Sequence, residues 1–185
     1  IGNQILFYWY ARLTGQANKI RRGEYELKKS MSAQEILDVL KSGKSIARTL
    51  TIAEGLNLFE IAQIFEQHKV GTKEEFWHWV RNPEWIRSLL GNESHDSLEG
   101  YLFPETYMVT KFMSTKDVLT QMVQRSLKTF EEVQQSIASS AATDKNKDSI
   151  ALRISKMNRH QLITLASIVE KETGAPEERP LIASI

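Results

Sequence analysis

Apolar residues recur at helical spacing through most of the chain, most clearly between Asn158 and Gly174. The residues of this stripe are Leu162, Leu165, Ala166 and Val169. Asn158 is a good N-cap, and Gly174 followed by Pro176 is a good helix end. The segment is therefore predicted to be a helix of about four turns whose stripe is buried.

The other periodic segments predict a mixture of helices and strands. Helices are expected over Gln4–Leu13, from the Ser30/Ser32 cap to Gly43, over Leu58–Gln67, from the Thr72 capping box onward, and over Ser114–Ser140. Strands are expected over Arg21–Leu27 and Ala47–Ile52, which alternate apolar and polar residues. Residues 20–70 would then run strand–helix–strand–helix, which indicates an α+β fold class.

Two carboxylates flank the stripe of the helix that starts at Asn158. At about 100° per residue, Glu172 lies roughly 70° to one side of the apolar centre and Glu170 roughly 90° to the other. A carboxyl group at such a border can be half desolvated, which is the environment that a general acid needs. The alternative is that both acids face water beside a core helix, and spacing alone favours that alternative.

The segment Leu98–Tyr107, LEGYLFPETY, is dense in apolar, aromatic and acidic residues. Its Gly100 and Pro104 disfavour regular helix, so we expect a loop. Such a loop could present Glu99 and Glu105 at the wall of a site, or it could be a turn that closes the core.

Three tryptophans lie close together in the sequence, at positions 77, 79 and 85. Their indole faces could stack on sugar rings, but core packing is the more common role for this residue.

Composition excludes several kinds of chemistry. The 185 residues are 41% hydrophobic and 25% charged, as in ordinary folded proteins, and the net charge of +1 gives no electrostatic case for nucleic acid. The chain has no cysteine and no apolar run near the roughly 20 residues of a membrane span. It starts and ends on apolar segments, so we expect it to be a piece of a longer protein.

Motifs for metal or cofactor chemistry are also missing from the sequence. The histidines at 68, 78, 95 and 160 have no metal-ligand spacing, and there is no nucleophile elbow, phosphate loop or dinucleotide fingerprint. We therefore expect neither a metal nor a cofactor. Acid–base work by carboxylates remains, and cleavage of a glycosidic bond fits it.

Two motifs together resemble one family. LEGYLFPETY and LASIVEKETG (165–174) are similar to motifs of the endolytic murein transglycosylase family, which is also called MltG-like or YceG-like. Further similar segments are RRGEYELKKSMSAQEILDVLKSGK (21–44), TIAEGLNLFEIAQIF (51–65), NPEW (82–85) and Glu178-Arg179. The resemblance covers nearly the whole chain.

The resemblance implies a bacterial enzyme that cuts nascent peptidoglycan between N-acetylmuramic acid and N-acetylglucosamine, within the strand. The product would be a 1,6-anhydromuramyl end, so the reaction would be a lytic transglycosylation. Residues 1–95 would be a LysM-like and linking region, and residues 96–185 the N-terminal part of the catalytic domain. An N-terminal helix outside this chain would anchor the protein in the inner membrane by a single pass, with the catalytic part outside the cytoplasm, beside cell-wall synthesis proteins.

The resemblance also assigns site residues. The family's catalytic glutamate precedes a threonine, which makes it Glu172 here. The residues expected to bind substrate or support Glu172 are Glu99, Tyr101, Phe103, Glu105, Glu170 and Thr173. The family continues beyond Ile185 into segments that complete its catalytic domain, so the cleft formed by this chain alone would be incomplete.

The residues themselves leave two other functions open. The chain could be a non-enzymatic glycan-binding or scaffolding module. It could also be a hydrolytic muramidase, which needs a second carboxylate about 5–10 Å from the first, and Glu99 or Glu105 could supply it.

Overall fold

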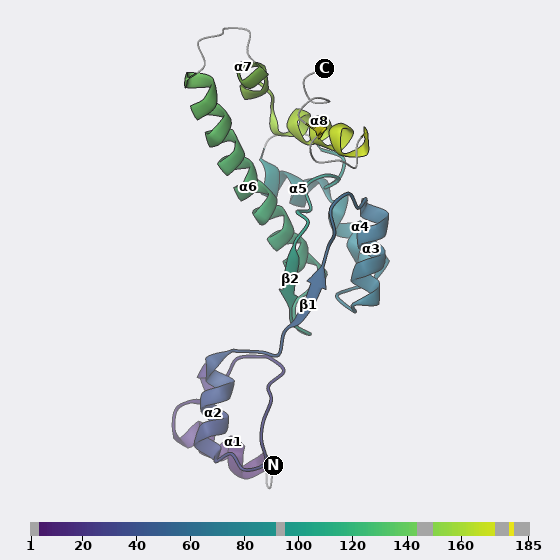
Figure 1. Ribbon diagram of the computed structural model, residues 1–185. Coiled ribbons are helices and arrows are strands. Elements are labelled where there is room, and N and C mark those ends of the chain that lie inside the picture. Colours follow the sequence, from purple (N-terminus) through teal and green to yellow (C-terminus); the bar gives the residue numbers. More distant parts are fainter. Residues whose placement is uncertain (1–3, 92–94, 144–149, 173–177, 180–185) are drawn as a thin grey trace. The chain divides into compact units, whose positions relative to one another are not determined.

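The computed structural model describes residues 4–91, 95–143, 150–172 and 178–179. These residues form helices and one two-stranded sheet of order β1-β2, so the α+β class is confirmed (Figure 1). The elements are α1 (Gln4–Leu13), the 3-10 helix Ala17–Lys19, α2 (Ala33–Ser42), β1 (Arg48–Thr51), α3 (Leu58–Gln67), α4 (Lys73–Val80), α5 (Pro83–Leu90), β2 (Thr106–Val109), α6 (Thr115–Thr143), α7 (Ile150–Ser155) and α8 (Arg159–Glu172). Among the residues described, no helix has the length and hydropathy that crossing a membrane requires.

The chain forms two compact units, and each is assembled from two separate stretches of sequence. Unit 1 comprises Ile1–Leu50 and Thr106–Ser114, and unit 2 comprises Thr51–Glu105 and Thr115–Ile185. The division at residue 95 that the family resemblance implies concerns functional parts and stays a prediction.

In unit 1, α2 begins and ends where its sequence predicts. The Ser32 side chain accepts a hydrogen bond from the Glu35 backbone N–H, and the Glu35 carboxylate accepts one from the Ser32 N–H in return. Gly43 follows the last turn at φ 69°, the left-handed conformation that glycine adopts most easily.

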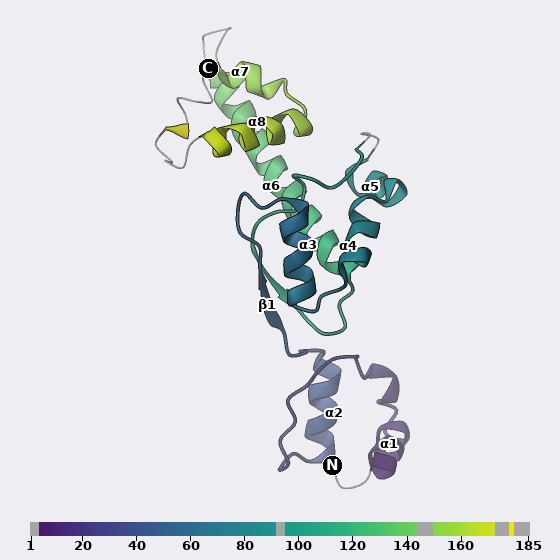
Figure 2. The same cartoon turned by 90° about the vertical axis from the view of Figure 1, so that its right-hand side faces the viewer.

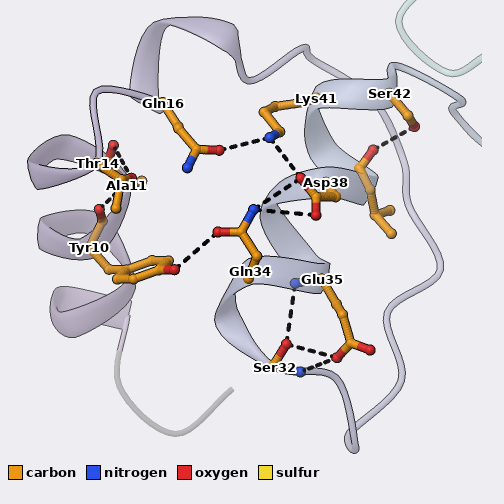
Figure 3. A network of polar contacts seen from close by, with 11 residues as sticks. Tyr10, Ala11, Thr14, Gln16, Ser32, Gln34, Glu35, Asp38, Lys41 and Ser42 are labelled. Atoms are coloured by element: carbon orange, nitrogen blue, oxygen red, sulfur yellow. Dashed lines mark hydrogen bonds and ion pairs between the residues drawn. The ribbon is translucent and has the colours of Figure 1, made fainter.

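A polar network joins α2 to α1 and to the segment that follows α1 (Figure 3). The Tyr10 hydroxyl donates to Gln34 Oε1 over 3.0 Å, and Gln34 Nε2 donates to Asp38. Lys41 Nζ lies 2.7 Å from Asp38 Oδ1 and donates to Gln16 Oε1. Hydrogen bonds from Lys41 and then Gln34 hold the pKa of Asp38 below its usual range.

The strand predicted over Arg21–Leu27 is wrong, because this segment has irregular backbone. Its hydrogen bonds go to scattered partners: the Glu24 N–H donates to the Ser45 hydroxyl, and the Glu24 carbonyl accepts from Ile46. The partner of β1 is instead β2, which lies more than fifty residues later in the chain. The expected strand–helix–strand–helix order for residues 20–70 is therefore also wrong.

The core of unit 2 lies where α3, α4 and the first half of α6 meet. Phe65 of α3 and Phe76 of α4 are fully buried, and their rings pack edge to face at 5.1 Å. Figure 2 shows α3 and α4 side by side. From α6 the core receives Val118, Leu119, Met122 and Val123.

The helical region that starts at Thr72 breaks into two helices. Asn82 caps α5 through a hydrogen bond from the Trp85 N–H, and Pro83 occupies the first turn of α5, where its missing N–H costs nothing. Trp85 is buried against Trp79 at 5.3 Å, so the core-packing role predicted for the tryptophans is confirmed for Trp85.

Candidate active site

Helix α8 forms as predicted from the Asn158 cap. Asn158 Oδ1 accepts from the Gln161 N–H, and Gln161 Oε1 accepts from the Asn158 N–H, each over 2.9 Å. The predicted burial of its apolar stripe is wrong, because none of the residues of α8 is buried. Leu162, Leu165 and Val169 are half-buried, and Ala166 is exposed. Individual side chains make its contacts with other elements: Ile163 lies against Gly100 of the loop, and the Arg159 guanidinium lies 5.9 Å from the centre of the Phe130 ring of α6.

Both candidate carboxylates of α8 are exposed, which agrees with the alternative that spacing favoured, in which both acids face water. Glu170 lies over the turn before α3, where its Oε1 would be 3.6 Å from a Cβ added at Gly55. Glu172 is the last residue of α8 and is open to solvent. A large polymeric substrate could therefore reach its carboxyl group from outside.

The loop that carries Glu99 and Tyr101 is fixed to two helices. Glu99 Oε2 accepts a hydrogen bond of 3.4 Å from the Leu58 N–H at the start of α3, where the helix dipole favours negative charge. Tyr101 is 1% exposed, and its hydroxyl lies 3.2 Å from His95 Nε2. Gly100, at φ +79°, contacts α8 so closely that a Cβ there would meet Ile163 Cγ2 at 2.6 Å.

The second half of the loop lies against α6. Arg125 Nε donates to Glu105 Oε2 over 2.9 Å, and the same guanidinium group lies 5.5 Å from the centre of the Phe103 ring. This ion pair is about 40% exposed on both sides, so it contributes at most about 1 kcal/mol. The structure thus brings Glu99 and Tyr101 together near α8 and places Phe103 and Glu105 at α6, while Thr173 lies outside the described residues.

A cavity of about 530 Å³ lies between this loop and the start of α8. It is lined by His95, Asp96, Ser97, Glu99, Tyr101, Asn158 and His160. The rings of His95 and His160 are 5.5 Å apart and inclined at 50°. In the described part of the chain, no three histidine or acidic side chains are placed to hold a metal ion.

Sequence reasoning identified Glu99 and Tyr101 but missed the histidines of this cavity. The histidines were tested only for metal-ligand spacing, and His95 and His160 are far apart in the chain. The one available signal was position, because His95 stands just before the LEGYLFPETY loop and His160 stands in the first turn of the EKET helix.

Replacing Gly100 with alanine is expected to loosen α8. The left-handed backbone at φ +79° costs about 1–2 kcal/mol for an alanine, and the added methyl group would also displace Ile163. Hydrogen exchange of the α8 amides should therefore become faster. Gly91→Ala is the matched control, because Gly91 has φ +85° and nothing within 4 Å of an added Cβ. Equal rates of amide hydrogen exchange in α8 of both variants would contradict the contact between Gly100 and Ile163.

Comparisons with known proteins identify the family. The YceG-like family model matches residues 1–185, so the chain belongs to the YceG-like family and the resemblance is confirmed. A protein named endolytic murein transglycosylase from Streptococcus pneumoniae is 30% identical over 98% of this chain and 34% of its own length. One of the same name from Bacillus subtilis is 28% identical over 100% of this chain and 51% of its own length. The chain thus spans about a third to a half of these relatives.

A solved structure has the same fold. The crystal structure of a YceG-like protein from Listeria monocytogenes matches with a TM-score of 0.55 and 23% identity. The match covers 96% of this chain and 58% of that chain.

Proposed function

We propose that this chain is part of an endolytic lytic transglycosylase that cleaves the bond between N-acetylmuramic acid and N-acetylglucosamine in peptidoglycan. The observation that carries the proposal is the family match over all 185 residues, together with two relatives that are named endolytic murein transglycosylase. The exposed carboxyl group of Glu172, at the end of a helix that contacts the LEGYLFPETY loop, is consistent with action on a long polymer.

In this proposal one carboxyl group serves twice. Glu172 first donates its proton to the glycosidic oxygen as positive charge develops on the sugar ring. The resulting carboxylate then accepts the proton of the muramic 6-hydroxyl, which attacks the anomeric carbon of the same sugar. Because that hydroxyl belongs to the substrate, it gains the advantage of an intramolecular nucleophile, and the product is a 1,6-anhydromuramyl end. The reaction therefore consumes no water and needs no second carboxylate.

The other candidate residues have supporting roles in the proposal. Glu99 holds the loop at the start of α3, and Tyr101 contacts His95, whose ring faces His160 of α8. Phe103 and Glu105 continue the same loop toward α6. Glu170 lies on the same helix as Glu172, and Thr173 follows Glu172 in the chain.

The proposal extends to the location and the remaining parts of the protein. We expect a single-pass anchor in the bacterial inner membrane, with this region outside the cytoplasm beside the proteins of cell-wall synthesis. Residues 1–95 would act as a LysM-like and linking region, and residues 96–185 as the first part of the catalytic domain.

Mass spectrometry of muropeptides tests the reaction. The full-length protein, incubated with uncrosslinked glycan strands, is expected to produce new anhydromuramyl ends inside the strands. New reducing ends would instead indicate a hydrolytic muramidase. Glycan binding without any cleavage would indicate a binding or scaffolding module.

A further inference from the structure

The cavity between the LEGYLFPETY loop and the start of α8 has the size of a small-molecule pocket, and its lining is mostly polar and partly open to solvent. Its volume of about 530 Å³ lies within the roughly 300–1,000 Å³ typical of small-molecule pockets. It is held open by ordered parts, because Tyr101 is almost fully buried beneath His95, and the Asn158 cap fixes the first turn of α8.

The lining of this cavity suits a neutral, hydroxyl-rich ligand. Imidazoles, a serine hydroxyl and two carboxylates in the lining offer both donors and acceptors, and the inclined rings of His95 and His160 add flat surface. Among the described residues that line the cavity, the acidic ones are Asp96 and Glu99, and none is lysine or arginine. An anionic ligand would therefore meet like charge without a permanent cation opposite.

The cavity is remote from the proposed catalytic carboxyl group. Helix α8 advances about 18 Å between His160 and Glu172 at the usual rise per residue. This distance exceeds the span of one sugar ring, so a sugar held at His160 would belong to a different part of the strand from the one being cleaved.

We propose that the cavity lined by His95, Asp96, Glu99 and His160 is a remote saccharide subsite, which takes an N-acetylglucosamine unit of the glycan strand in preference to the anionic muramic acid. This inference rests on the proposed function. The subsite holds the strand away from the scissile bond and so favours cutting at internal positions. Binding energy gained there positions the reacting sugar at Glu172.

A local binding experiment tests the subsite directly. Chitotetraose, a neutral oligomer of N-acetylglucosamine, is titrated into the full-length protein while the imidazole NMR signals are followed. The signals of His95 and His160 are expected to shift, and those of His68 and His78 to stay in place. In His160→Ala, the change at His95 should require about tenfold more chitotetraose, which corresponds to the loss of a hydrogen bond. His160→Gln keeps a hydrogen-bonding side chain and should recover part of the affinity.

The matched control is His68→Ala, because His68 is another exposed histidine of unit 2 and does not line the cavity. It should bind chitotetraose like the wild type. Failure of chitotetraose to shift His95 and His160, or equal affinity in His160→Ala and His68→Ala, would overturn the subsite. Tighter binding of free N-acetylmuramic acid than of N-acetylglucosamine would overturn its stated preference.

Product lengths separate the subsite from the reaction. With uncrosslinked strands, His160→Ala should still form anhydromuramyl ends but should release a different distribution of fragment lengths, whereas His68→Ala should not. An unchanged distribution in His160→Ala would overturn the role of the subsite in setting the cutting position. If the wild type bound chitotetraose at His160 but produced no anhydromuramyl ends, the subsite would stand and the proposed reaction would fall.

Discussion

Glu172→Gln is expected to abolish the formation of anhydromuramyl ends while leaving the fold intact. Glutamine has nearly the same shape, but it can neither donate the proton to the glycosidic oxygen nor accept one from the 6-hydroxyl. Loss of a general acid–base group costs on the order of 10²–10⁴ in rate, so the product should fall below detection in muropeptide mass spectra. Because the side chain is exposed at the end of α8, the substitution should not change stability.

The matched control for this variant is Glu131→Gln. Glu131 is an exposed carboxylate on α6, outside the loop and the helix that form the candidate site. The Glu131→Gln variant should cut glycan strands at the wild-type rate. Full activity of Glu172→Gln, with Glu131→Gln also active, would remove Glu172 from the catalytic role and leave the reaction to another group.

Phe76→Ala is expected to cause the largest loss of stability in unit 2. Phe76 is fully buried, and its ring contacts both Phe65 and Trp77. Removal of a buried phenylalanine ring costs about 3–5 kcal/mol, which is a large part of the roughly 5–15 kcal/mol that stabilises a typical domain. Urea denaturation followed by tryptophan fluorescence should show the midpoint moving to lower urea, because Trp77 adjoins the deleted ring.

Phe59→Ala provides the comparison for this measurement. Phe59 also contacts a tryptophan ring, with its centre 4.7 Å from that of Trp77, but it is 69% exposed. Its removal should lower stability far less than Phe76→Ala, because little apolar surface returns to water. Similar shifts in both variants would mean that the buried contact between Phe65 and Phe76 does not dominate the stability of unit 2.

Local signals in the sequence predicted the helices well. Gln4–Leu13 and Leu58–Gln67 have the predicted limits, and α2 is bounded by the Ser32 cap and Gly43. Capping residues specify both ends of α2 and the start of α3, so the chain itself carries this information locally.

Predictions that depended on distant partners were less successful. Arg21–Leu27 alternates like a strand, but the hydrogen-bonding partner that makes a strand is chosen by the whole fold, and β1 pairs with β2 instead. The same limit applies to α8, whose periodic stripe predicts an apolar face but not how deeply that face is buried.

The candidate site was predictable only in part for a similar reason. The LEGYLFPETY loop and α8 were identified separately, and the contact between Gly100 and Ile163 that joins them leaves no periodic signal. The pairing of His95 with His160 also arises from tertiary structure alone. Single-residue chemistry therefore pointed to the carboxylates at the end of α8, and only the three-dimensional arrangement revealed the cavity at its start.

The divided construction of the two units has a consequence for how the protein is made. A ribosome delivers β1 well before β2, with α3, α4 and α5 emerging between them. Unit 1 therefore cannot complete its sheet when its own first fifty residues appear, and the edge of β1 stays unpaired until residue 109 has followed. A nascent or truncated chain that ends before β2 exposes that edge to other chains, so fragments cut near residue 95 are expected to associate more readily than the longer protein.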